Sequence, residues 1–157
     1  MHVFTVGYEG CDIDHFTRSL KKQGIELVAD LRKNPLSRKK GFSKNRLAAA
    51  LQERRIDYLH LPDLGVPAEW RKKAKAGEIT RARMFHDYAR KILPRGQASL
   101  ERLQELLQTK EVALLCYEAD AEDCHRSFVA RDLKARAQRG FKIHHLLIPP
   151  PARRRIF

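Results

Sequence analysis

Long apolar runs, an export signal and paired cysteines are all missing from this sequence. No apolar stretch approaches the roughly 20 residues that a membrane-spanning helix requires, so no membrane partner is expected. The first residues reach Glu9 and Asp12 at once and lack the charged leader of a secretory signal. Three cysteines, Cys11, Cys116 and Cys124, are an odd number, which favours reduced thiols over a disulfide framework. We therefore expect a soluble, cytoplasmic protein.

Acidic residues are scarce relative to basic ones, 19 against 32, which gives a net charge of +13. Such an excess favours a polyanionic partner, and nucleic acid or a nucleotide comes first among these. The segment from Arg32 to Arg46 contains seven of the positive residues and no negative one. Neither of the usual glycine-rich nucleotide-binding motifs is present. Which cofactor or protein partner the chain has, if any, is left open by the sequence.

Length and hydropathy pattern predict the fold class. With 157 residues, 43% of them hydrophobic, the chain is predicted to form one α/β domain over residues 1–148, followed by a basic Pro/Arg tail over residues 149–157. Short apolar runs alternate with helical patterns, which is typical of a mostly parallel five-stranded sheet with helices on both faces. The segment 62–110 is too long for one crossover and predicts a helical insertion between the third and fourth strands. The expected strands are 2–6, 27–31, 57–61, 112–117 and 142–148.

Polar residues follow several of the predicted strands. In an open parallel sheet, ligands bind at the carboxyl ends of the strands, so these residues are expected to meet in a single cleft. The start of the last helix, predicted near Asp123, returns to the same edge. The residues expected there are Gly7, Tyr8, Gly10, Asp30, Arg32, Cys116, Glu118, Cys124, His125 and Arg126.

The same residues carry a resemblance to a known family. The segments Thr5–Gly10, Asp30-x-Arg32, His60–Gly65, Cys116-x-Glu118 and Cys124-His125-Arg126 resemble the domain of unknown function 488 family of bacteria and archaea. The similarity extends from residue 3 to about residue 148. It implies a small α/β domain without a settled activity, so it supports the fold and the site but implies no reaction.

Arg32 and Arg126 are the strongest candidates for binding an anion. A phosphate at the start of the last helix would meet Arg126, with Arg32 approaching from the neighbouring strand and Tyr8 below it. Gly7 and Gly10 would permit a close approach of the backbone. The alternative is an internal ion pair of Arg126 with Asp30 or Glu118.

The loop after the second strand is a second candidate for anion binding. Arg38, Lys39 and Lys40 would neutralise phosphates, and a base would stack on Phe42. The alternative is that this loop is only a solvated surface.

Cys116 and Glu118 are the candidate catalytic residues, as a thiolate nucleophile and a general acid or base. The alternative is that Cys116 is simply a small buried residue of a strand. No metal site is expected, because the chain has no close pair of cysteines. Cys124 and His125, if both lie on a helix, point about 100° apart. Like the two cysteines, Glu118 and His125, His60 has a side chain that can bind a metal ion.

Three functions follow from these features. The favoured one is binding of nucleic acid, or another phosphate-bearing ligand, at the carboxyl edge of the sheet. The second is an enzyme that acts on a nucleotide or nucleic acid through Cys116 and Glu118. The third is a structural or protein-interaction scaffold. The sequence alone leaves the choice between binding and catalysis open.

Overall fold

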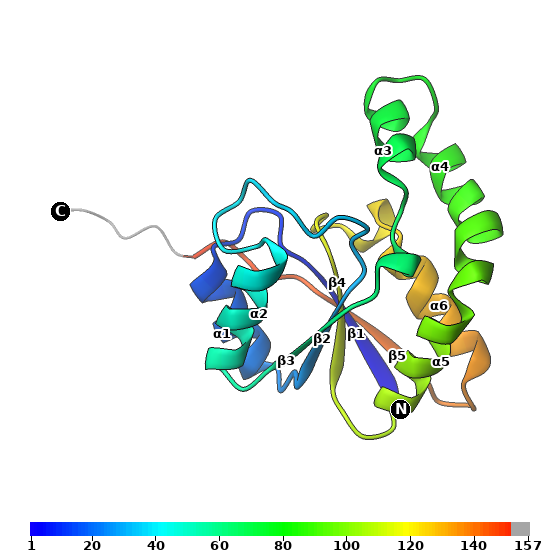
Figure 1. The fold of residues 1–157 in the computed structure, drawn as a ribbon. Coiled ribbons are helices and arrows are strands. Elements are labelled where there is room, and N and C mark those ends of the chain that lie inside the picture. The colour runs from blue at the N-terminus through cyan, green and yellow to red at the C-terminus, as the bar shows by residue number, and fades with distance from the viewer. Residues whose placement is uncertain (152–157) are drawn as a thin grey trace.

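A five-stranded sheet forms the centre of the computed structural model, which describes residues 1–151 (Figure 1). Each pair of neighbouring strands is parallel, and their order is β3-β2-β4-β1-β5. The predicted α/β class is confirmed, and the strand boundaries lie within two residues of the predicted ones. The strands are β1 His2–Gly7, β2 Leu27–Asp30, β3 Asp57–His60, β4 Val112–Cys116 and β5 Lys142–Leu146.

Helices cover both faces of the sheet, as Figure 1 shows. On one face, α1 (Ile13–Lys22) and α2 (Lys44–Glu53) bury apolar side chains in one hydrophobic cluster. On the other face, α5 (Gln97–Leu106) and α6 (Arg126–Arg136) contribute to a second cluster. The central strand β4 supplies both clusters, because successive side chains of a strand point to opposite faces. Its Ala113 and Leu115 belong to the first cluster and its Leu114 to the second.

Local sequence signals fix the first helix. The side chain of Asp12 accepts a hydrogen bond from the backbone N–H of His15 at 2.8 Å and so caps the start of α1. Gly24 follows the helix with φ +78°, a left-handed conformation that glycine adopts at low cost. These ends agree with the predicted ones, so α1 returns the chain to the sheet where the pattern predicts.

A helical insertion connects β3 to β4 and extends beyond the sheet in Figure 1. Its last segments, from α4 onward, follow one another without a break, even through Pro94 and Gly96. Pro94 lies in the first turn of a short 3₁₀ segment, where its missing N–H costs no hydrogen bond. The segments are η1 (Pro62–Leu64), α3 (Ala68–Lys75), α4 (Arg81–Asp87), η2 (Tyr88–Ile92), η3 (Leu93–Gly96) and α5.

The end of the described chain has no regular secondary structure over residues 147–151. Most of the basic tail predicted over residues 149–157, including Arg153, Arg154 and Arg155, lies outside the described residues. Within residues 1–151, every helix is too short or too polar to cross a bilayer.

Candidate functional site at the carboxyl edge of the sheet

A cleft of about 630 Å³ opens at the carboxyl ends of the strands. Its walls come from the loop after β2, from helices α3 and α4 of the insertion, and from the residues that end β4. The loop that contains Lys39 and Lys40 lines a separate, shallower cavity of about 530 Å³. Asp30, Cys124 and Arg126 do not line the cleft. The predicted site residues that do line it are Tyr8, Arg32, Arg38, Cys116, Glu118 and His125.

Arg32 is held by an internal ion pair beneath the cleft. Its Nε and Nη2 donate to the two carboxylate oxygens of Asp30 at 2.9 and 2.8 Å. Its Nη1 donates to the Tyr8 hydroxyl at 3.2 Å and to the Phe42 carbonyl at 2.7 Å. Tyr58 donates its hydroxyl to Asp30 at 2.5 Å, so the buried carboxylate has several partners. Burial works to lower the pKa of Arg32, but the hydrogen bonds and charge of Asp30 raise it above its ordinary value. Most N–H groups of this guanidinium are therefore used within the protein.

Arg126 is fully buried and also used internally. Its Nη1 and Nη2 donate to the backbone carbonyls of Glu118, at 2.5 Å, and Ala119, at 3.1 Å. The structure therefore does not bring Arg126 to the ligand side of the cleft. The predicted ion pair of Arg126 with Asp30 or Glu118 is wrong, because Arg32 pairs with Asp30 and Arg81 with Glu118. Arg126 instead stabilises the loop that follows β4 through these two hydrogen bonds.

Two glycines allow backbone segments to approach each other around the cleft. A Cβ atom on Gly7 would lie 1.7 Å from the carbonyl oxygen of Glu118, so the loop after β4 passes directly over β1. A Cβ on Gly65 would lie 2.4 Å from the backbone nitrogen of Lys33, so the loops after β2 and β3 are in backbone contact. Gly10 has φ +77° in a turn. The close approach predicted at Gly7 is thus made by the chain itself.

The aromatic ring expected to stack on a base is not available. Phe42 is fully buried and stacks on Tyr8, with 4.5 Å between the ring centroids, while Phe16 packs against its edge. The prediction that Phe42 contacts a base is therefore wrong, because the loop folds inward at this residue. Tyr117, which the sequence analysis missed, is 47% exposed and lines the cleft, with its ring edge-on to Tyr8. Its position directly after β4 was the signal that could have found it.

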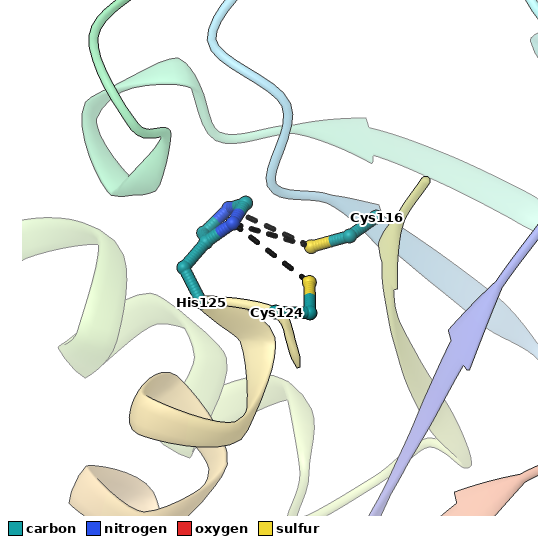
Figure 2. Close-up of side chains that lie close together, drawn as sticks. All are labelled: Cys116, Cys124 and His125. Atoms are coloured by element: carbon teal, nitrogen blue, oxygen red, sulfur yellow. Dashed lines mark hydrogen bonds between the residues drawn. The ribbon is translucent and has the colours of Figure 1, made fainter. Parts of the chain in front are cut away.

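Cys116, Cys124 and His125 form a buried group, here called the floor group, which Figure 2 shows. The sulfur of Cys116 lies 3.7 Å from Nδ1 and 3.5 Å from Nε2 of His125. The sulfur of Cys124 lies 3.9 Å from the same Nδ1. The three ligand atoms are all within 4.8 Å of one another. His60 is not part of the group, since its Nε2 is hydrogen-bonded to the Arg32 carbonyl at 2.7 Å.

The convergence of Cys124 and His125 corrects the predicted start of the last helix. Helix α6 begins at Arg126, and Cys124 before it has the extended conformation φ −148°, ψ 144°. The two side chains would diverge by about 100° only if both lay on a helix. Because Cys124 precedes the helix, its sulfur can approach the His125 ring.

The floor group changes the ionisation of its own members. Burial raises the pKa of the Cys116 thiol well above its ordinary value. Burial also works against ionisation of Cys124, but hydrogen bonds from Cys116 and His125 lower the pKa of Cys124 well below its ordinary value. Burial and the negative charge of Cys124 raise the pKa of Glu118 to about 7. The surroundings thus favour a thiolate at Cys124 over one at Cys116, and the catalytic roles of Cys116 and Glu118 stay predictions.

Four positive side chains on the cleft walls, here called the rim cations, differ from Arg32 and Arg126. They are Lys33, Arg38, Arg71 and Lys75. Within residues 1–151, none of them forms an ion pair or a side-chain hydrogen bond, unlike Arg81, which binds Glu118 and Asp123. Arg71 and Lys75 are four residues apart and share one face of α3. Neither residue was predicted as part of the site, although their spacing is visible in the sequence.

Comparison with known proteins identifies a family but adds no activity. The model of the family described as "Domain of unknown function DUF488" matches residues 12–133, which is most of the chain. No curated protein and no solved structure matches the chain.

Proposed function

Because this chain belongs to the DUF488 family, whose description assigns no activity, we propose a function from the cleft itself. We infer that the cleft binds single-stranded nucleic acid. The rim cations contact the phosphates, and the exposed ring of Tyr117 stacks on a base. The observation that carries this proposal is that four cations without an ion-pair partner among residues 1–151 line one cleft in a protein with a net charge of +13.

The charge distribution supports an anionic ligand. Lys33 and Arg38 come from the loop after β2, and Arg71 and Lys75 come from α3, so positive charge lines two walls of the cleft. Cations without protein partners repel one another across a confined space, and a bound polyanion relieves this repulsion. Glu118, the one carboxylate of the described residues that lines the cleft, is already next to Arg81.

The aromatic ring supports a single strand over a duplex. An exposed ring can stack on a base only when the face of that base is free, which requires an unpaired nucleotide. Tyr117 lines the same cleft as the rim cations and is edge-on to Tyr8. Phosphate contacts with one base-stacking ring are typical of single-strand binding with little sequence preference.

The test is a binding titration of labelled DNA and RNA oligonucleotides, single-stranded and duplex, at several salt concentrations. The double variant R71Q/K75Q should lose affinity for single strands, and the slope of log affinity against log salt should fall by about 0.7 for each lost phosphate contact. The matched control K21Q/K22Q removes two cations at the exposed end of α1, away from the cleft. Equal losses in the two variants, or a preference for the duplex, would contradict the proposal.

An enzyme that acts on the bound strand is a second candidate, favoured by one observation. Cys116, Glu118 and His125 line the same cleft, so reactive groups would lie beside the ligand. Oligonucleotides incubated with the protein and analysed by mass spectrometry would show a change of mass. The change should disappear in C116S and E118Q proteins that still fold and still bind.

A further inference from the structure

The floor group has the composition and spacing of a metal site. We propose that Cys116, Cys124 and His125 bind a zinc ion at the floor of the cleft, with the fourth coordination position open to the cleft. This proposal concerns the floor group alone and does not depend on nucleic-acid binding.

The distances between the ligand atoms suit one tetrahedral ion. Zinc binds thiolate sulfur at about 2.3 Å and imidazole nitrogen at about 2.0 Å, so tetrahedral angles place sulfur and nitrogen about 3.5 Å apart. The Nδ1 of His125 lies 3.7 Å from the sulfur of Cys116 and 3.9 Å from that of Cys124. A contraction of a few tenths of an ångström therefore brings both sulfurs to the distance that zinc requires. Figure 2 shows both sulfurs on the same side of the imidazole ring.

The imidazole of His125 is oriented as a metal ligand would be. Its Nε2 donates to the backbone carbonyl of Leu31 at 3.1 Å, which leaves the lone pair of Nδ1 available to a metal ion. Tyr88 packs its ring edge-on against the imidazole, with 5.3 Å between centroids. A hydrogen bond from the second nitrogen to a carbonyl is the usual outer contact of a metal-binding histidine. The ring is thus fixed independently of the two cysteines.

The chemistry of the three ligands selects among metals. Two thiolates and one imidazole are soft and borderline donors, which suit zinc and exclude calcium or magnesium. Within the described residues, the side-chain partners of the two sulfurs are His125, each other and, for Cys124, Glu118. A bound ion would take the place of the hydrogen bond between the two thiols.

The fourth position faces the cleft. Cys116 and His125 both line the cleft, whereas Cys124 does not. The carboxylate of Glu118 lies beside Cys124 but is not among the atoms that come together with all three ligands. Three protein ligands with one position left for water or another small ligand is the arrangement of catalytic zinc sites, whereas structural sites use four protein ligands.

The first test is the metal content of the intact protein. Protein purified from zinc-supplemented medium should contain stoichiometric zinc by elemental analysis. Cobalt added after zinc removal should give the intense visible absorption of tetrahedral Co²⁺ and a thiolate-to-cobalt charge-transfer band. C116S and C124S should lose the stoichiometric metal. C11S is the matched control, because Cys11 is equally buried but belongs to the other hydrophobic cluster, and it should keep the metal.

The wild-type cobalt titration keeps the proposal falsifiable if the serine variants fail to fold. An octahedral cobalt spectrum, a metal-free protein, or recovery of Cys116 and Cys124 as a disulfide would overturn the zinc site. Cyanide should change the spectrum of the cobalt protein, since it can occupy the open position. A cobalt spectrum that cyanide leaves unchanged would contradict the open position.

Discussion

The walls and the floor of the cleft contain positive charge of two different kinds. Arg32 and Arg126 are buried, and their guanidinium groups bind a carboxylate, a hydroxyl and backbone carbonyls. The rim cations have no such partners in the described chain. A buried charged group is stable only when it is hydrogen-bonded or paired within the protein. A cation on the cleft wall is solvated instead and stays available to bind an anionic ligand. The side chains that shape the site are thus different from those that can meet a ligand.

We therefore expect substitutions around the buried arginines to change the stability of the protein, and substitutions on the cleft walls to change its binding of the ligand. The largest effect is expected for D30A, which leaves the buried guanidinium of Arg32 without its counter-charge. Removal of one partner of a buried ion pair costs about 3–5 kcal/mol. Urea denaturation should show this loss in the free energy of unfolding.

The control for D30A is D14A. Asp14 forms ion pairs with Arg18 and Arg54, but its side chain is 61% exposed, and such pairs contribute at most about 1 kcal/mol. If both variants lose the same free energy of unfolding, the ion pair of Asp30 and Arg32 contributes no more to stability than an exposed pair.

A smaller loss is expected for G7A. The new Cβ would overlap the backbone of Glu118, so the loop after β4 must move away from β1 at a cost of about 2–3 kcal/mol. Gly77 provides the comparison, because it has φ +77° but no atom within 4 Å of a Cβ. Its replacement by alanine should cost about 1 kcal/mol, from backbone strain alone. Thermal denaturation measures both losses of stability. A G7A protein as stable as G77A would show that the loop after β4 moves at little cost in free energy.

The smallest effect on stability is expected for Y117L. This exposed side chain should change the free energy of unfolding by less than about 0.5 kcal/mol. The affinity for single-stranded oligonucleotides should nevertheless fall about tenfold or more, since stacking of a base on an aromatic ring contributes about 1–3 kcal/mol. The conservative variant Y117F keeps the ring and should keep the affinity. Equal binding by Y117L and wild type would remove Tyr117 from the site.

The fold could be predicted because its signals are local and repeated. The apolar runs, the cap at Asp12 and the glycine after α1 each indicate where an element starts or ends. The rule that parallel strands present their carboxyl ends at one edge then brought together residues distant in the sequence. Cys116, Glu118 and His125 do line one cleft.

The side-chain contacts within the site could not be predicted, because they depend on conformations that the sequence does not reveal. The partners of Arg32 and Arg126 depend on whether each side chain is buried, and neither composition nor spacing determines that. Cys124 was assigned to a helix that begins two residues later, so its approach to His125 was missed. The contribution of α3 depended on how the insertion folds back over the edge, which is a long-range property.

The contact at Gly65 determines how the two walls of the cleft are spaced. Since the main chain of one wall lies against the main chain at Lys33 of the other, no flexible side chain separates them. The spacing of the two loops is therefore set by backbone, whereas the long side chains of the rim cations keep their rotamer freedom. The cleft can thus keep its width while its positive groups adjust to the negative groups of a ligand.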